Sequence, residues 1–412
     1  TPYQPEIAQG TLQALFYLGY SYFGVLAITE GYQWMVAGSQ GTELYLRLIM
    51  FTSAGFLVLC TVPIAAKWLL IGRWKPQQIR IWSLAYVRFW VVRTMVQANP
   101  ILLFLGSPLY VLYLRALGAN IGRGVVILSV HVPVCTDLLT VGDGTIIRKD
   151  TFFNCYRAQA GLIQTGAVTL GKDVLVSEAT VLDIETSMGD GAQLGHASSL
   201  HAGQAVPAGE RWHGSPAQRT EVDYRAVGPT RCGTLRRVVY SILQLLKTLV
   251  VTVPLGVGIV ATLLTAVPWL AALDAAPPAL TSRTFYRDAL ALSFVLYFGF
   301  GLVGLLVIVT VPRVLNLAIK PDKVYPLYGF HFAVHRTIAR MTNNRFFTAL
   351  FGDSSYIVPY LRGVGYQLSP VVQTGSNFGT QVKHENPYLV AVGNGTVCAS
   401  ELSIITADFS ST

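Results

Sequence analysis

The chain has 412 residues and a net charge of +9, yet only 12% of its residues are charged and 52% are hydrophobic. Because a soluble globular protein carries about 25% charged residues, this composition argues against an ordinary cytosolic enzyme. Disorder and a collagen-like structure are excluded as well, since charges are sparse and the 38 Gly follow no three-residue period. The five Cys are scattered without a CxxC pair, which indicates reduced thiols rather than a disulfide framework or a zinc site.

Four apolar windows without a charged residue are long enough to cross a bilayer, which takes about 20 residues. They cover residues 7–29, 48–66, 248–273 and 289–312. The first window is the weakest, because it contains two Gln and three Tyr. The chain starts with TPYQPEIAQG, which has no Met and no basic stretch typical of a signal peptide, so we expect a piece of a longer polypeptide.

Basic residues lie on one side of each pair of windows. Six Lys or Arg follow the second window, four Arg precede the third, and three Lys or Arg follow the fourth, whereas the loops inside the pairs hold three Arg in total. This excess predicts a multi-pass protein of the plasma (inner) membrane whose soluble segments face the cytoplasm. It also indicates membrane lipid as a partner and argues against nucleic acid.

The stretch between the two window pairs has a six-residue period. Neither the two-residue period of a half-buried strand nor the 3.6-residue period of a helix produces this spacing. A hexapeptide repeat does, because each repeat forms one short strand and turn of a parallel β-helix. The apolar positions of seven unbroken repeats are Leu170, Val176, Leu182, Met188, Leu194, Leu200 and Val206.

Upstream of residue 170 the period is less regular. Val141, Ile147 and Phe153 keep the phase, but insertions interrupt it at 131–139 and 154–167. Insertions in β-helices become loops on one face, which is often the functional face. We therefore expect functional side chains near these two interruptions as well as in the regular repeats.

Three hexapeptides form one coil, so residues 18 apart are expected to stack on adjacent coils, about 4.8 Å apart. Glu178 and His196 are 18 residues apart, and so are Asp183 and His201. A carboxylate beneath an imidazole fixes its tautomer and raises its basicity, as a general base requires. We predict Glu178 with His196 as the catalytic pair and Asp183 with His201 as the alternative; the purely structural interpretation is that all four are solvated coil corners.

His131 lies in the first insertion, near Asp137, and this loop position makes it a further catalytic candidate. His213 is expected in the loop that ends the coils. The spacing of Cys135, Asp137 and Cys155 does not resemble a metal site, so no metal is expected. No phosphate-binding glycine loop and no nucleophile elbow is present in the sequence.

The second half of the chain repeats the first after about 245 residues. KP at 75 recurs at 320, LRALG at 114 recurs as LRGVG at 361, and VGDGT at 141 recurs as VGNGT at 392. Each repeat is a window pair, an aromatic and basic stretch, and the start of a β-helix. In the first repeat, Trp82, Tyr86, Phe89, Trp90 and Arg93 stand at helical spacing, which predicts a helix in the membrane interface or one that packs on the β-helix.

These patterns predict a membrane protein of mixed α and β structure, in which transmembrane helix pairs alternate with parallel β-helix domains. The expected domains are a helix pair at 1–73, an amphipathic interfacial linker at 74–117, a hexapeptide-repeat β-helix at 118–225, a second helix pair at 226–319, a linker at 320–363 and the start of a truncated second β-helix at 364–412.

Two strings, GVVILSVHVPVCTDLLTVGDGTIIRKDTFF and SMGDGAQLGHASSLHAGQAVPAGERWHGSPAQRT, carry a resemblance to a known family. With the alternating spans and β-helices, they resemble the C-terminal membrane region of the Pls/PosA family of nonribosomal peptide synthetases, the ε-poly-lysine synthetase type. The chain also resembles left-handed β-helix acyltransferases, whose last coil ends in a Gly-x-Pro-Ala turn like GSPA at 214–217. The left-handed sense of the coils is implied by this resemblance.

The resemblance implies the acyl-transfer part of a synthetase. In that family, peptide or isopeptide bonds form from an aminoacyl thioester on the phosphopantetheine of a carrier protein, with no cofactor bound directly by the membrane region. The implied partners are the carrier and adenylation domains, expected on the same polypeptide, and an amino acid or amine acceptor. Two alternatives stay open: an acyl-CoA-dependent acyltransferase that modifies a lipid or sugar at the membrane surface, and a non-catalytic docking or export scaffold.

Overall fold

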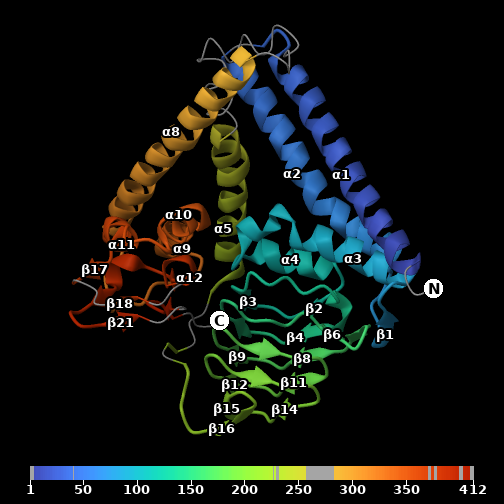
Figure 1. The fold of residues 1–412 in the computed structure, drawn as a ribbon. Coiled ribbons are helices and arrows are strands. Elements are labelled where there is room, and N and C mark those ends of the chain that lie inside the picture. The colour runs from blue at the N-terminus through green and yellow to red at the C-terminus, as the bar shows by residue number, and fades with distance from the viewer. Residues whose placement is uncertain are drawn as a thin grey trace. The chain divides into compact units, whose positions relative to one another are not determined.

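The computed structural model describes residues 4–39, 41–225, 227–228, 232–256, 283–369, 373–374, 378–398 and 402–408. The chain forms two compact units, one within residues 1–258 and one within residues 259–409. Each unit contains one of the two sequence repeats, and in each a long apolar helix precedes short helices and parallel strands (Figure 1).

Long helices open the first unit, and shorter ones connect them to the strands. Apolar stretches of this length form helices in a membrane because every backbone hydrogen bond is then made within the segment. The helical segments of this unit are α1 (Gln4–Val36), α2 (Thr42–Leu70), α3 (Leu84–Gln97), the 3₁₀ segment η1 (Pro100–Phe104), α4 (Pro108–Ala116), the 3₁₀ turn η2 (Thr136–Leu138), α5 (Thr234–Leu246) and the π-helical η3 (Lys247–Thr252).

Four helices in the described part of the chain are long and apolar enough to span a membrane: Gln9–Met35, Thr42–Leu70, Thr234–Gly256 and Tyr297–Asn316. The first, second and fourth overlap the expected windows. The third begins well before residue 248, because neither Pro nor Gly interrupts the sequence TLRRVVYSILQLLKT. It therefore includes Arg236 and Arg237 in its first turn, and the expected residues 257–273 lie outside the described residues.

The helix expected from the aromatic spacing is α3, and it packs on the unit's core. Ser83 caps it, with its hydroxyl accepting a hydrogen bond from the Tyr86 nitrogen at 3.2 Å. Trp82 precedes the helix with a φ of 71° and is not part of it, which corrects the expected pattern. The Phe89 ring is 2% exposed and packs edge-on against Tyr156, with ring centroids 5.0 Å apart. The aromatic face of α3 thus contributes to the core rather than only to a membrane surface.

Short strands of the first unit form three parallel ladders, and the chain passes through them in turn. Over the regular repeats, paired residues are 18 apart, as for Val181 with Ser199 and Gln193 with Arg211. The first ladder contains β2 (Asn120–Ile121), β4 (Leu139–Val141), β8 (Val168–Leu170), β11 (Thr186–Met188) and β14 (Ala205–Val206). The second contains β3 (Val126–Ile127), β5 (Ile146–Ile147), β9 (Leu175–Val176), β12 (Gln193–Leu194) and β15 (Arg211–Gly214), and the third contains β10 (Val181–Leu182) and β13 (Ser199–Leu200).

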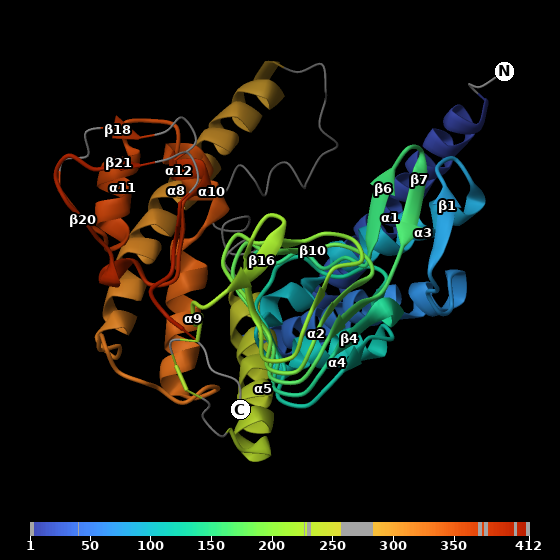
Figure 2. The same ribbon diagram turned by 90° about the horizontal axis from the view of Figure 1, so that it is seen from below.

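The six-residue register predicted from the sequence is confirmed by burial. None of the seven apolar repeat positions from 170 to 206 is more than 3% exposed. Figure 2 looks at the coils from the end near β16 (Ala217–Thr220), where successive coils overlie one another. The antiparallel pair of β15 and β16 ends the stack. The left-handed sense of the coils stays a prediction.

The insertion at 154–167 forms a hairpin of β6 (Tyr156–Gln159) and β7 (Leu162–Thr165). The strand β1 (Gln77–Arg80) pairs antiparallel with β7, so the stretch at 74–117, expected as an amphipathic linker, also contributes a strand. Ile79 is 4% exposed between exposed neighbours, which is the alternation of a half-buried strand. The hairpin lengthens its coil, because Ile147 pairs with Val176, 29 residues later instead of 18.

A buried ion pair fixes the end of α2 to the first coil, and we call this contact the first joint. Lys67 Nζ lies 2.7 Å from Asp137 Oδ2, and the Lys67 side chain is 0% exposed. The same carboxylate oxygen accepts a hydrogen bond from the Trp74 backbone nitrogen at 3.1 Å. Gly118 lies against Asp137 so closely that any side chain there would collide with the carboxylate. The coil therefore starts from a fixed point on α2.

The second unit has the same order of elements. Its helical segments are α8 (Arg283–Asn316), α9 (Phe330–Thr342), α10 (Arg345–Phe351), α11 (Ile357–Val364), α12 (Phe378–Gln381) and the 3₁₀ turn η4 (Pro387–Leu389). Three parallel pairs follow, formed by β17 (Gln367–Leu368) with β20 (Ala391–Val392), β18 (Gln373–Thr374) with β21 (Val397–Cys398), and β19 (Lys383–His384) with β22 (Ser403–Ile404).

A hydrogen bond between two neutral amides connects the end of α8 to the turn before β20, and we call this contact the second joint. Asn386 is 0% exposed, and its Nδ2 donates a hydrogen bond to Asn316 Oδ1 at 2.9 Å. Asn386 Oδ1 accepts a hydrogen bond from the Tyr388 nitrogen at 3.1 Å. Arg313 of α8 donates to the Gly363 carbonyl oxygen at 3.2 Å. The span and the first strands are again held together by polar groups.

Candidate active site

One corner of the coil stack brings Glu178 and His196 together. The two residues occupy equivalent places on adjacent coils, where the Ala197 nitrogen donates a hydrogen bond to the Glu178 carbonyl oxygen at 2.9 Å. The next residue on each coil, Ala179 or Ala197, has a positive φ of 55° or 52°. This left-handed conformation turns the chain sharply at the corner. The 18-residue period therefore places the two side chains in one column.

Three side chains form a contact series at this corner. His196 Nδ1 lies 2.8 Å from Glu178 Oε2, and Glu178 Oε1 lies 2.5 Å from Arg148 Nε. The Glu178 and Arg148 side chains are 6% and 3% exposed, whereas His196 is 42% exposed. The His196 contact is an ion-pair distance rather than an aligned hydrogen bond, and such contacts often tighten only when substrate binds.

This arrangement prepares the imidazole for proton transfer. A buried carboxylate at Nδ1 favours the tautomer with hydrogen on Nδ1, which leaves the lone pair on the exposed side at Nε2. The Arg148 guanidinium, whose Nε lies 2.5 Å from Glu178 Oε1, fixes the carboxylate beside the imidazole. A carboxylate in this position stabilises the positive charge that develops on an imidazole when it takes a proton. The corner is thus able to accept a proton from a group that approaches from solvent.

A strap at 221–225 returns along the coils and covers one side of the His196 ring. The Tyr224 ring lies edge-on to His196, with centroids 5.8 Å apart, and is stacked on His213 at 5.9 Å. Gln193 holds the strap, because its Oε1 accepts from the Tyr224 nitrogen at 2.9 Å and its Nε2 donates to Asp223 at 3.0 Å. A methyl group at Gly195 would lie 2.5 Å from the Tyr224 ring, so only glycine admits the ring here.

Charge and hydrogen bonds also hold Asp223 in the strap. Its carboxylate accepts hydrogen bonds from the Arg225 nitrogen and from Gln193, both at 3.0 Å, and Arg211 Nη2 lies 2.8 Å away. The backbone hydrogen bond from Arg225 is the main cause that lowers the pKa of Asp223, with smaller effects from Gln193 and from the two Arg charges. Asp223 is therefore ionised when it fixes Tyr224 beside the corner.

The alternative pair is not joined in the same way. Asp183 Oδ2 lies 3.4 Å from Arg157 Nη1, and its Oδ1 accepts from the Ile184 nitrogen at 2.7 Å. The His201 backbone nitrogen donates to Gln204 Oε1 at 2.7 Å. In the described part of the chain, no hydrogen bond or ion pair joins the Asp183 and His201 side chains. Their strands are neighbours, but the geometry of Glu178 and His196 is not repeated there.

The other two histidines of the first unit lie outside the contact series. The His131 ring is stacked on Phe152, with centroids 3.6 Å apart, on the face of the third ladder. Asp137, expected near His131, instead pairs with Lys67 in the first joint. His213, expected in a terminal loop, belongs to strand β15, because the chain extends the second ladder before it turns. His131 is thus on the coil face and not in the contact series.

Sequence reasoning missed Arg148 and Tyr224. Arg148 follows Ile147, which is in phase with the repeats, but the hairpin insertion lengthens the coil, so the 18-residue rule does not connect it to Glu178. Tyr224 follows the last repeat and has no period that would place it. Ile147 keeps the six-residue phase, so the sequence would have placed Arg148 beside Glu178 if the length of the insertion in that coil had been taken into account. Among the described residues, no group of three His, Cys, Asp or Glu side chains could hold a metal ion.

Comparison with curated proteins gives a partial match. The chain is 35% identical over 152 residues to a delta-poly-L-ornithine synthetase of Acinetobacter baumannii (strain AB307-0294). The match covers 37% of this chain and 11% of the synthetase, so the chain spans only a small part of that relative's length. No model of a known protein family matches the chain.

Solved structures of hexapeptide-repeat enzymes are similar at a low level. A hexapeptide-repeat acetyltransferase from Vibrio cholerae O1 biovar eltor has 15% identity and a TM-score of 0.26, covering 31% of this chain and 87% of its own. A maltose O-acetyltransferase from Clostridium difficile 630 has 10% identity and a TM-score of 0.22, covering 41% and 89%. Likenesses this low do not bear on what the chain does, and its coils are assigned from their own strand pairing.

Proposed function

We propose that this chain is a membrane-bound acyl or aminoacyl transferase in which His196 is the general base. The observation that carries the proposal is the contact series of Arg148, Glu178 and His196, in which a buried ion pair meets an imidazole that is 42% exposed. An amine acceptor is mostly protonated near pH 7, so its attack on an acyl group requires a base.

In the proposed reaction, the acceptor amine attacks the carbonyl carbon of a thioester. A C–N bond forms while Nε2 of His196 takes a proton from the amine, and backbone N–H groups stabilise the charge on the carbonyl oxygen. The C–S bond then breaks, and His196 returns the proton to the departing thiolate. Glu178 acts as a positioning residue that stabilises the imidazolium, and Arg148 holds Glu178 in place. The products are an amide and a thiol.

The donor is proposed to be an aminoacyl thioester on the phosphopantetheine of a carrier domain. The match to a poly-ornithine synthetase supports an amino acid as substrate. On the coil face beside the corner, Phe152 and Val181 are 41% and 42% exposed and paired on adjacent coils, where they fit the apolar part of a pantetheine arm. Because CoA carries the same arm, transfer from acyl-CoA to a lipid or sugar acceptor is the alternative.

Two further features belong to the proposal. The coils are proposed to face the cytoplasm, because Lys and Arg are concentrated beside the spans on that side. The carrier and adenylation domains are proposed to belong to the same, longer polypeptide. The test therefore uses that full polypeptide in its membrane.

Substitution of the base tests the proposal. His196→Ala should lower the rate of amide formation about 10²- to 10⁴-fold, while membrane insertion stays at the parental level. Glu178→Gln should cost less, because it keeps the shape and one acceptor oxygen. The double variant should be no slower than His196→Ala alone, since residues that act as a unit are not additive. Rates are measured with a carrier-bound aminoacyl thioester and with the matching CoA thioester.

Three outcomes decide the assignment. A His201→Ala variant that loses more activity than His196→Ala would move the base to the alternative pair. A faster reaction with the CoA thioester would select the acyl-CoA alternative. Unchanged product formation by His196→Ala would contradict catalysis at this corner and favour a docking or export scaffold.

A further inference from the structure

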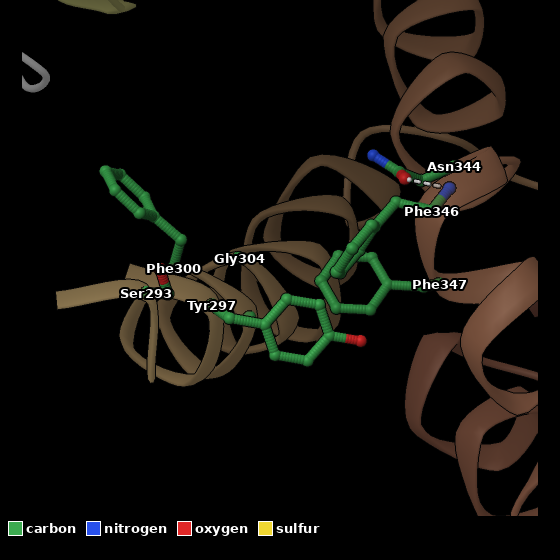
Figure 3. A pocket seen from close by; sticks show the side chains of 8 residues that line it. Ser293, Tyr297, Phe300, Gly304, Asn344, Phe346 and Phe347 are labelled. Atoms are coloured by element: carbon green, nitrogen blue, oxygen red, sulfur yellow. Dashed lines mark hydrogen bonds between the residues drawn. The ribbon is translucent and has the colours of Figure 1, made fainter. Parts of the chain in front are cut away.

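A groove of about 530 Å³ lies between α8 and the short helix α10 of the second unit (Figure 3). This volume is in the range of about 300–1,000 Å³ in which proteins bury small molecules. Its aromatic lining residues are Tyr297 and Phe300 of α8 and Phe346 and Phe347 of α10. The groove is separate from the corner that holds His196, which belongs to the first unit.

The first unit fills the matching place with its own side chains. There the short helix η1, which follows Asn99, packs Phe104 edge-on against Phe56 of α2, with ring centroids 5.6 Å apart. Asn99 Nδ2 also donates to the Leu59 carbonyl oxygen of the span at 3.1 Å. The span and the short helix are therefore in direct contact, and their polar groups are paired.

The second unit joins the two helices through a different ring pair, in which Tyr297 of α8 lies edge-on to Phe346 of α10 with ring centroids 5.9 Å apart. Its short helix follows Asn344, which is 245 residues after Asn99, the same interval that separates the two KP pairs. It faces Gly301 and Gly304 of α8. A methyl group at Gly301 would meet no atom within 4 Å, and only Phe347 approaches Gly304. Gly301 stands 245 residues after Phe56, so the groove lies beside the position whose ring packs on Phe104 in the first unit.

The polar groups of the groove suit a mainly apolar ligand with one acceptor. The Ser293 hydroxyl donates to the Ala289 carbonyl oxygen at 2.8 Å, and Asn344 Oδ1 caps α10 by accepting from the Phe346 nitrogen at 3.0 Å. Figure 3 shows the Asn344 amide nitrogen on the side away from this bond. Among the described residues it donates no hydrogen bond. The Asn344 amide nitrogen is therefore the hydrogen-bond donor at the edge of the aromatic groove.

In a membrane, lipid would surround the apolar face of this helix. The groove begins in the part of α8 that is apolar enough to span a membrane, and nearby α8 side chains such as Phe294 and Leu302 are 62% and 67% exposed. In a bilayer such surfaces contact acyl chains, and helices there associate by close packing and hydrogen bonds rather than by the hydrophobic effect. An acyl chain fills a groove of this kind by contact with the four rings, and a lipid ester oxygen matches the Asn344 donor.

We propose that the groove between α8 and α10 binds one acyl chain of a glycerophospholipid, with Asn344 donating a hydrogen bond to an ester oxygen of the same lipid. In the first unit, Phe56 and Phe104 pack on each other at the corresponding place. The proposal is independent of the reaction assigned to His196. It gives the second unit a lipid-binding role of its own.

Photo-cross-linking tests this site. The full chain is reconstituted in vesicles of phosphatidylethanolamine and phosphatidylglycerol that contain a phospholipid with a diazirine in one acyl chain, and labelled peptides are identified by mass spectrometry. Labelling should concentrate at 293–304 and 344–347. Gly301→Phe should remove it, because the new ring occupies the groove, whereas Gly299→Phe, on an open face of the same helix, should leave it unchanged.

The Asn344 donor is tested separately. Asn344→Asp keeps the oxygen that caps α10 but removes the donor, so labelling of the groove should fall about threefold, the effect of one hydrogen bond in a membrane. Equal labelling in the parent and Gly301→Phe, or labelling spread evenly along α8, would overturn the proposal. So would cross-links from a photoreactive residue at 301 to another segment of this chain or to a second copy, because protein would then occupy the groove.

Discussion

In the first repeat the end of α2 meets the coil through a buried charge pair, whereas in the second the end of α8 meets its strands through neutral amides. The backbone around the first joint resembles the backbone around the second. Arg115 Nε donates to the Ile121 carbonyl oxygen at 2.9 Å, and Arg362 Nε donates to the Leu368 carbonyl oxygen at 3.1 Å. The same fold of the chain therefore tolerates either kind of joint, provided that buried polar groups have partners.

Each joint also contains a glycine at the end of a short helix. Gly118 and Gly365 both end a short helix with a positive φ, of 107° and 126°. A side chain at Gly118 would strike the Asp137 carboxylate, and one at Gly365 would come within 2.5 Å of the Tyr388 ring. In both places glycine lets a residue of the following 3₁₀ turn reach the helix end. What differs is that one such residue carries a charge and the other an aromatic ring.

Breaking the charged joint should have the largest effect on stability. Lys67→Met leaves the Asp137 carboxylate buried without its cation, which should cost about 3–5 kcal/mol of unfolding free energy. Lys67→Met with Asp137→Asn should recover most of this loss, because the amide oxygen still accepts from Trp74. Thermal unfolding in detergent, with hydrogen exchange of peptides 118–141, measures both variants. Equal stability of the single variant and the parent would show that the pair is not buried.

Breaking the neutral joint should cost less. Asn386→Ala removes the partners of Asn316 Oδ1 and of the Tyr388 nitrogen, which should cost about 1–3 kcal/mol, since neutral groups are cheaper to leave unpaired than charges. Faster hydrogen exchange should be confined to peptides 378–398, with 118–141 unchanged. Asn386→Asp keeps the acceptor for Tyr388 and is the matched control. A larger loss than for Lys67→Met would contradict the assumed order of charged and neutral joints.

The smallest effect on stability is expected in the strap at 221–225, and only at acid pH. Because the pKa of Asp223 is lowered in the folded chain, its ionised form stabilises the strap above its ordinary pKa of about 3.9 and stops doing so as pH falls through the lowered value. Hydrogen exchange of 221–225, corrected for the intrinsic rate, should therefore be constant from pH 8 to about 5 and rise only in stronger acid. Asp223→Asn should remove this dependence at a cost of less than about 1 kcal/mol, since the group is exposed.

The regular coils and the contact of Glu178 with His196 were predictable from the sequence, because one six-residue period determines both burial and stacking. The other features of the fold and the site depend on contacts between residues whose spacing follows no period. Arg148 reaches Glu178 across an insertion, β1 pairs with a strand 88 residues away at Gln77 and Thr165, and Lys67 lies in a span while its partner lies in a turn. The helix before residue 248 was missed because the window required an absence of charge, whereas Arg236 and Arg237 are compatible with helix.

The first joint has a geometric consequence for the corner that holds His196. Between β3 in the first coil and β12, which precedes His196, the second ladder makes three steps, or roughly 14 Å at the usual strand spacing. Because the first joint fixes the coils to α2, the number of coils sets the distance of the imidazole from the end of that helix. Each turn between them contributes about 4.8 Å to this distance. A reactant held at the end of α2 would therefore have to reach across this distance to meet His196.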